Sequence, residues 1–214
     1  MSSRAGSVLG LGKARVESLT DGIFGTVMTV LVLSIIVPYV TGPVDLTQTA
    51  PNLIPLVPAI LSYALSFSIL GVFWVGHHAV FHYILRTDRT LIWLNNFFLL
   101  CVGLLPLTSA LLGHYPLAQE TQVLYALNLI AVGLMLYATF WYATVHHHLV
   151  DANLDLAIVR SARRRILMGP CLAVLAIALT FVNTDLSLAA FVVFPVLFIL
   201  PGRIDALWRR QEYP

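Results

Sequence analysis

The chain has 214 residues, of which 59% are hydrophobic and only 10% are charged, and its formal net charge is +2. A soluble globular domain carries about 25% charged residues. The composition therefore excludes an ordinary soluble fold and predicts an all-α integral membrane protein. The small net charge gives no indication of a nucleic-acid partner.

Long stretches without Asp, Glu, Lys or Arg alternate with short charged patches along the whole chain. A hydrocarbon core about 30 Å thick needs roughly 20 mainly apolar residues of helix, and six stretches reach or approach that length. We therefore predict a bundle of six transmembrane helices, at about 16–39, 54–85, 90–112, 120–146, 165–182 and 186–200.

The basic residues predict the orientation of these spans. All twelve Lys and Arg lie at the same set of span ends, and the alternate loops near 41–53, 114–120 and 183–187 contain none. The positive-inside rule then requires an even number of spans with both termini in the cytoplasm. We predict a single membrane domain over 1–214, with cytoplasmic tails at 1–14 and 203–214.

Small and hydroxyl side chains form a stripe on the first span. At about 100° per residue, Gly22, Thr26, Thr29 and Leu33 share one face of the helix, and Asp21 lies on a neighbouring face. Such a stripe has two interpretations. It allows close helix–helix packing, or it lines a pore with hydroxyl ligands and a dry Leu constriction. The spacing alone favours close packing.

Ionisable groups stand at the inner mouth of the same span. Arg15 and Asp21 are functional candidates, because charged groups beside a span usually face protein or water. Arg15 equally fits an interfacial anchor. For Asp21 we favour a buried hydrogen-bonding role, since the positive-inside rule gives no reason for an acid there.

Polar residues at a similar depth on the next two spans suggest partners for Asp21. His77 and His78 lie two to three turns inside Arg86, and Asn95 and Asn96 lie near the start of the third span. A buried polar ring costs free energy unless it is hydrogen-bonded. We predict a network of Asp21, His77 or His78, and Asn95 or Asn96, which either joins the spans or acts as a pH-sensitive latch.

The sequence gives no strong indication of a metal site or cofactor. His146, His147 and His148 point in different directions on a helix, so all three chelate one metal poorly. Cys101 and Cys171 lie in apolar runs and have no metal-ligand spacing. The prediction is no resident metal and no cofactor.

Three motifs resemble one known family. Arg15-x-x-x-Leu19-Thr20-Asp21-Gly-Ile-Phe24 is similar to the Arg-x-x-x-Phe-Ser-Asp signature of the lysosomal potassium channel family, transmembrane protein one-seven-five. The segments Phe73-Trp74-x-x-His77-His78-x-x-Phe81 and Leu91-x-Trp93-Leu94-Asn95-x-x-Phe98, together with Pro106, resemble its second and third spans.

The resemblance implies a passive potassium-permeable cation channel without a cofactor. Bacterial members are single six-span units that form homotetramers, with a pore on the symmetry axis lined by the first span. Thr29 matches the family's Thr ring and Leu33 an apolar ring one turn outward, so potassium is expected near Thr26 and Thr29. Thr26 departs from the family's usual Ile or Leu, which shifts more of the constriction to Leu33. The resemblance also implies that the protein lies in the plasma (inner) membrane of a bacterium and contacts its lipids.

Other functions stay open at this stage. A proton-linked secondary transporter, or a proton-permeable channel, would use Asp21 and His77 as a relay, although no broken mid-depth helices are evident. An intramembrane enzyme would need a nucleophile or metal deep in the bundle, which the sequence does not offer, so we predict no enzyme. A scaffold without a transport role is the remaining alternative.

Overall fold

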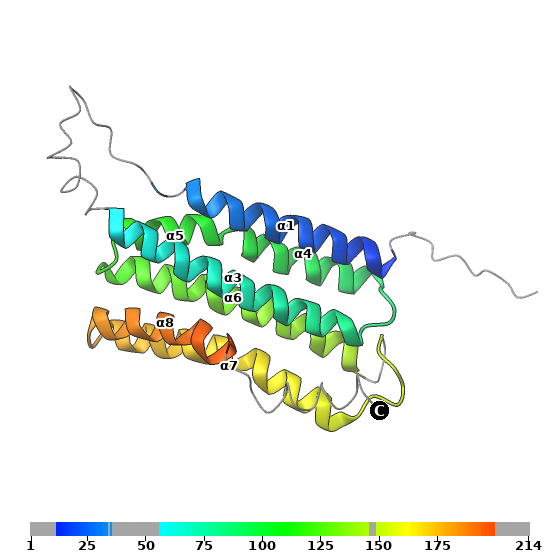
Figure 1. The fold of residues 1–214 in the computed structure, drawn as a ribbon. Helices are drawn as coiled ribbons and strands as arrows, with labels where there is room; N and C mark the ends of the chain where they lie inside the picture. The colour runs from blue at the N-terminus through cyan, green and yellow to red at the C-terminus, as the bar shows by residue number, and fades with distance from the viewer. Residues whose placement is uncertain (1–11, 34, 36–55, 146–148, 200–214) are drawn as a thin grey trace, which may run out of the picture.

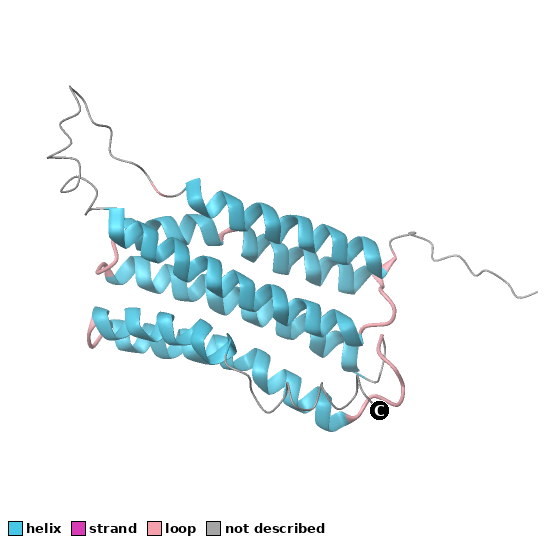
Figure 2. Cartoon of the chain, viewed as in Figure 1, coloured by secondary structure: helices cyan, strands magenta, loops and turns pink. Residues whose placement is uncertain are grey.

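The computed structural model describes residues 12–33, 35, 56–145 and 149–199, and these residues form a bundle of helices that run side by side (Figures 1 and 2). Outside the helices, the described residues contain one isolated antiparallel bridge, between Ile84 and Val150. The all-α prediction is confirmed. The helices, labelled as in Figure 1, are α1 (Lys13–Leu33), α3 (Val57–Tyr83), α4 (Arg89–Gly103), α5 (Leu105–His114), α6 (Gln119–Thr144), α7 (Leu156–Thr180) and α8 (Thr184–Ile199).

Four helical rods in the described residues are long and apolar enough to cross a membrane. They are α1, α3, α4 with α5 taken as one rod (Arg89–His114), and α6. The apolar helix α8 has only 16 residues, and α7 carries four arginines in its first half. Six helical rods are present when α4 and α5 are taken as one, and the predicted count of six membrane spans stays a prediction.

The predicted span boundaries agree with most helices to within a few residues. The helix α1 begins at Lys13, so residues 13 and 14 are helical rather than part of a tail as predicted. The expected continuation of the first span to residue 39 and the tail over 203–214 fall outside the described residues, as do His146, His147 and His148.

The third predicted span, which we expected to be continuous, is broken at Leu104. Pro106 stands in the first turn of α5 and has no N–H to donate to a carbonyl in the preceding turn. Asn128 of α6 bonds to both sides of the break, since its Nδ2 donates to the Cys101 carbonyl at 2.9 Å and its Oδ1 accepts from Thr108 Oγ1 at 3.1 Å. A side chain of α6 thus stabilises the break.

The helix α7 begins nine residues before the predicted start of the fifth span, at Leu156 rather than 165. Asp155 caps it, because its carboxylate accepts a hydrogen bond from the Ala157 amide at 2.7 Å. The cap lets the helix begin within the polar inner segment, before the apolar stretch that follows the arginines.

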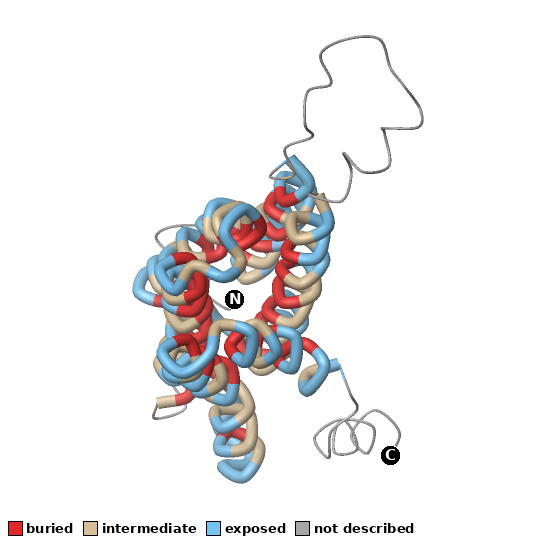
Figure 3. The backbone as a smooth tube through the Cα atoms, turned by 90° about the vertical axis from the view of Figure 1, so that its left-hand side faces the viewer, coloured by how far each residue is buried: buried red, intermediate tan, exposed pale blue. Residues whose placement is uncertain are grey.

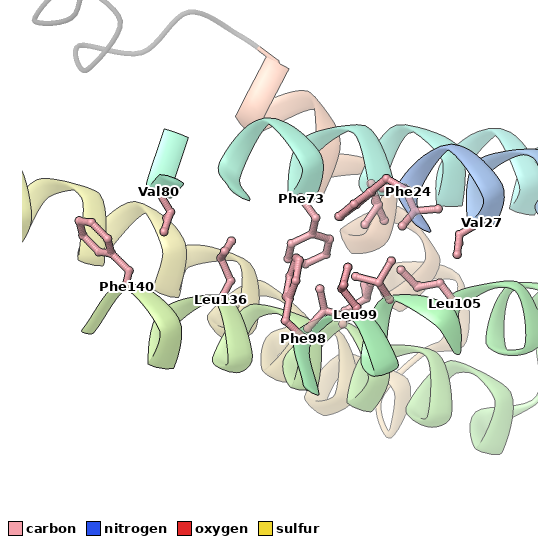
Figure 4. Close-up of a cluster of buried hydrophobic side chains, with 14 of the residues drawn as sticks. Phe24, Val27, Phe73, Val80, Phe98, Leu99, Leu105, Leu136 and Phe140 are labelled. Carbon is pink, nitrogen blue, oxygen red and sulfur yellow. The ribbon is translucent and has the colours of Figure 1, made fainter. Parts of the chain in front are cut away.

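Each rod has buried residues, and along the backbone they lie mainly on the sides that face the middle of the bundle (Figure 3). Helix α1 packs on α3, α4 and α5, whereas α7 and α8 pack on each other and on α6 or α3 at the opposite side of the bundle (Figure 1). Figure 4 shows part of this core, to which α1, α3, α4, α5 and α6 contribute Phe24, Val27, Phe73, Val80, Phe98, Leu99, Leu105, Leu136 and Phe140.

Two buried polar clusters hold the opposite end of the bundle from the arginines. Ser66 of α3 bonds to Ser109 of α5 at 2.8 Å and to the hydroxyl of Tyr125 of α6 at 2.9 Å. Gln122 of α6 accepts from Thr180 Oγ1 of α7 at 2.9 Å. Because buried polar groups lose their bonds to water, each satisfied pair favours this one arrangement of helices.

Candidate functional site

The helix α1 has two unlike faces. Its buried face consists of Val16, Thr20, Phe24, Val27 and Leu31, which pack toward the other helices. At about 100° per residue, the stripe of Gly22, Thr26, Thr29 and Leu33 lies on the opposite side of the helix. The stripe therefore faces away from the other described helices.

No side chain of the described residues covers the stripe. All four of its residues are exposed, and Leu33 is 76% exposed. A Cβ atom placed on Gly22 meets nothing within 4 Å. Within the described residues the stripe therefore packs against no other helix of the same chain, and the two interpretations, close packing against a helix of another copy or pore lining, stay predictions.

The two threonine hydroxyls point their protons back into the helix. Thr26 Oγ1 donates to the Gly22 carbonyl at 2.8 Å, and Thr29 Oγ1 donates to the Thr26 carbonyl at 2.8 Å. A hydroxyl has one donor and two acceptor lone pairs. With the proton engaged in the helix, each oxygen presents its lone pairs to whatever lies on the exposed side, which suits a cation or the proton of a water molecule.

A buried chain of hydrogen bonds connects three helices, α1, α3 and α4. His77 Nε2 of α3 bonds to Asn95 Oδ1 of α4 at 2.9 Å, and Asn95 Nδ2 donates to Thr20 Oγ1 of α1 at 3.0 Å. Thr20 in turn donates to the Val16 carbonyl at 2.9 Å. Thr20, Asn95 and His77 are 0%, 1% and 3% exposed, so these bonds form out of contact with solvent.

Aromatic rings enclose the histidine of this chain. The His77 ring stacks on Phe81 at 4.2 Å between centroids and on Phe98 at 5.4 Å. Stacking on two rings and a hydrogen bond to Asn95 fix the orientation of the imidazole. The contacts join α3 to α4 beneath the buried face of α1.

Asp21 does not belong to this chain of bonds, contrary to the predicted network. Its Oδ1 accepts from the indole Nε1 of Trp74 at 2.9 Å, and no hydrogen bond joins it to His77 or His78 in the described residues. The reason is the helix phase, since Asp21 is exposed beside α3 while Thr20 points inward. His78 stacks on the same Trp74 at 6.3 Å and is also exposed.

The remaining predicted site residues, Arg15 and Asn96, belong neither to the stripe of α1 nor to the buried hydrogen-bond chain. Arg15 is exposed at the start of α1, and Asn96 is half-buried on α4. Within the described ranges, no group of three His, Cys, Asp or Glu side chains is placed to hold a metal ion.

The sequence did not predict that Thr20 of α1 is the partner of Asn95, or that Trp74 of α3 is the partner of Asp21. A signal for Thr20 was present, because the helical wheel places its hydroxyl among the apolar residues of the buried face. No comparable signal exists for Trp74, which is 53 residues from Asp21 in the chain.

Comparison with known proteins shows which protein family the chain is similar to. Residues 15–106, which include most of α1 and all of α3 and α4, match the family model described as endosomal/lysosomal potassium channel TMEM175. A potassium channel of Streptomyces collinus is 35% identical over 180 residues, which cover 82% of this chain and 86% of that protein. The chain belongs to the TMEM175 family. This is a family of channels and not of enzymes.

Two further TMEM175 proteins bear on the fold and on the transported ion. The crystal structure of a lysosomal potassium-selective channel TMEM175 homolog from Chamaesiphon minutus superposes with a TM-score of 0.73 at 28% identity and covers 88% of this chain and 96% of that chain. The human endosomal/lysosomal proton channel TMEM175 is 28% identical over 89% of this chain, which spans 41% of the human protein.

Proposed function

We propose that the chain is a passive potassium-permeable channel of the TMEM175 family and that α1 lines its pore. The observation that carries the proposal is the uncovered polar stripe of α1. An apolar membrane helix that exposes Thr26 and Thr29 would leave two hydroxyl groups facing lipid in an isolated chain. Relatives named as potassium channels support the choice of ion.

Four copies around one axis would bring four stripes together, because closed cyclic symmetry places the same face of each copy toward the axis. In this proposed homotetramer, Thr26 and Thr29 form two rings of hydroxyl oxygens. Their protons are held by helix carbonyls, so the lone pairs are free to replace water around a potassium ion.

Leu33 is proposed as the apolar constriction. It lies one turn beyond Thr29 on the same stripe and projects from the bundle. A ring of leucines disfavours water and so limits flow when it is narrow. Because Thr26 is polar where an apolar ring is implied by the family resemblance, we expect selectivity that depends mainly on Thr29 and Leu33.

The buried chain Thr20–Asn95–His77 has a positioning role in this proposal. It holds the buried face of α1 against α3 and α4, which fixes the rotation of α1 about its axis and so the direction of the stripe. Asp21 of α1 and Trp74 of α3 lie exposed beside each other, where a neighbouring copy would cover them. Arg15 marks the cytoplasmic mouth, and we propose the plasma (inner) membrane of a bacterium as the location.

Potassium flux into proteoliposomes tests the proposal, with sodium and protons as comparison ions. We expect potassium flux from the purified protein and a several-fold change in flux or in the potassium-to-sodium ratio in Thr29→Ala. The control is Ser68→Ala, because Ser68 Oγ of α3 also donates to a carbonyl of its own helix, four residues earlier rather than the three of Thr29. Potassium flux that is absent, or is altered equally by both variants, contradicts the proposal.

Proton permeation is the second candidate function, favoured by the proton channel named among the relatives. Asp21 and His77 lie on adjacent helices, but the hydrogen bonds described above do not connect them. A relay would need water between them. Proton-driven dye quenching in the same proteoliposomes, without potassium flux and abolished in Asp21→Asn, would favour this candidate over the potassium channel.

A further inference from the structure

We propose that the outward face of α7 binds an anionic phospholipid, with its headgroup at Arg160, Arg163 and Arg164 and its acyl chain along the apolar surface that follows. The proposal concerns a helix on the side of the bundle away from α1. It does not rest on the proposed channel function, because the ligand and the site are independent of the transported ion.

The order of side chains along this face matches the order of parts in a phospholipid. Arg160 and Arg164 are exposed one turn apart, and Met168, Cys171 and Leu175 continue the same face toward the middle of the helix. At about 100° per residue these five positions fall within one narrow sector. A phosphate at the charged end therefore leaves an acyl chain lying along an apolar strip.

Arg163 supplies a fixed donor beside the two exposed arginines. Its Nη2 donates to Thr144 Oγ1 of α6 at 2.7 Å, and Thr144 Oγ1 donates to the Phe140 carbonyl at 2.6 Å. The Nε of Arg163 is buried and has no hydrogen-bond partner in the part of the chain that the structure describes. A buried donor without a partner is unfavourable, and a phosphate oxygen can accept from it.

Among the described residues, no carboxylate forms an ion pair with the exposed arginines of this cluster. The nearby Asp155 caps the backbone of α7 through the Ala157 amide. Neither Arg160 nor Arg164 forms an ion pair with a described residue. Arginine binds phosphate in a planar, forked geometry. The available charge and the donor geometry therefore fit a phosphodiester more closely than a single surface ion pair.

The position of the cluster also fits a headgroup. The first half of α7 lies at the same end of the bundle as the start of α1 and the end of α3 (Figure 1). All the described Lys and Arg side chains lie at this end, which the positive-inside rule assigns to the leaflet facing the cytoplasm. Anionic lipids attract juxtamembrane arginines at such a surface.

The test is native mass spectrometry of the purified full chain, with phosphatidylglycerol titrated and the affinity of the first bound lipid measured. We expect Arg160→Gln/Arg164→Gln to weaken binding roughly 10- to 30-fold, from the contribution of each arginine near an anionic lipid. Arg163→Lys, which keeps the charge but loses Nε and the fork, is expected to weaken it several-fold. The control Arg86→Gln/Arg89→Gln removes the same charge from two exposed residues of another inner turn and is expected to bind as the unchanged chain does.

Two further probes separate a lipid from other phosphates. Phosphatidylcholine is expected to bind at least tenfold more weakly, and inorganic phosphate at equal concentration is expected not to displace phosphatidylglycerol. The proposal is overturned if the control double variant loses as much affinity as Arg160→Gln/Arg164→Gln. It is equally overturned if phosphatidylcholine binds as tightly or if inorganic phosphate displaces the lipid.

Discussion

Threonine has two different roles on the single helix α1, and burial separates them. Thr20 is fully buried and accepts a bond from Asn95, whereas Thr26 and Thr29 donate to carbonyls of α1 and are exposed among the described residues. The first arrangement uses the hydroxyl to join helices. The second leaves oxygen lone pairs for a ligand outside the chain.

At the residue scale, Asn95 is the member of the buried chain whose loss leaves most groups without a partner. Asn95→Ala removes the bonds to both His77 and Thr20, so we expect a loss of about 1–3 kcal/mol in stability. The measurement is thermal unfolding of the purified protein in detergent. The control Asn96→Ala changes the half-buried neighbour, and an equal loss in both variants would contradict a special role for Asn95.

The sequence predicted which residue types would pair at this depth but only some of the pairs. Histidine and asparagine buried near one another in apolar spans need hydrogen bonds, so a pairing of His77 or His78 with Asn95 or Asn96 was foreseeable. Which members pair depends on the rotation of α3 and α4 about their axes. That rotation follows from packing such as the His77–Phe81 and His77–Phe98 stacks, and local sequence does not determine it.

At the element scale, the apolar runs predicted the rods well, and the misses fall where polar side chains alter the backbone. The break between α4 and α5 lies next to Pro106 and is stabilised by Asn128, which lies 27 residues after the carbonyl to which it donates. The early start of α7 depends on the Asp155 cap within a charged inner segment. Counting hydrophobic residues locates the bilayer, but caps and long-range hydrogen bonds locate the ends of helices.

A close contact between α6 and α7 gives a prediction at this scale. A Cβ placed on Gly133 would lie 2.6 Å from Cγ of Pro170, a buried ring inside α7. Gly133→Ala should therefore separate the two helices and lower the unfolding temperature, even though Ala is the better helix former by about 1 kcal/mol.

The control for that substitution is Gly103→Ala, whose added Cβ meets nothing within 4 Å. It is expected to leave the unfolding temperature unchanged or slightly raised. If Gly133→Ala is as stable as the control in thermal unfolding, α6 and α7 do not require this close contact.

At the scale of the whole molecule, the two sides of the bundle differ in whether their polar residues are buried or exposed. The helices α6, α7 and α8 close against one another with buried polar pairs such as Thr180 with Gln122. The helix α1 packs on one face only and exposes small and hydroxyl residues on the other. The amino-acid sequence predicted that stripe, but assigning it to the outside of the chain required the helix packing.

The central claim is that this uncovered face of α1 lines an aqueous pore. The most direct test places a cysteine on it, Thr29→Cys, in a Cys101→Ser/Cys171→Ser background that removes both natural thiols. Potassium flux from proteoliposomes is measured before and after a cationic thiol reagent. Val30→Cys is the control, because Val30 lies at the same depth about 100° around the helix. We predict that the reagent blocks flux through Thr29→Cys and leaves Val30→Cys unaffected. An active Thr29→Cys channel that resists the reagent, or equal block of both variants, would contradict a pore lined by this face.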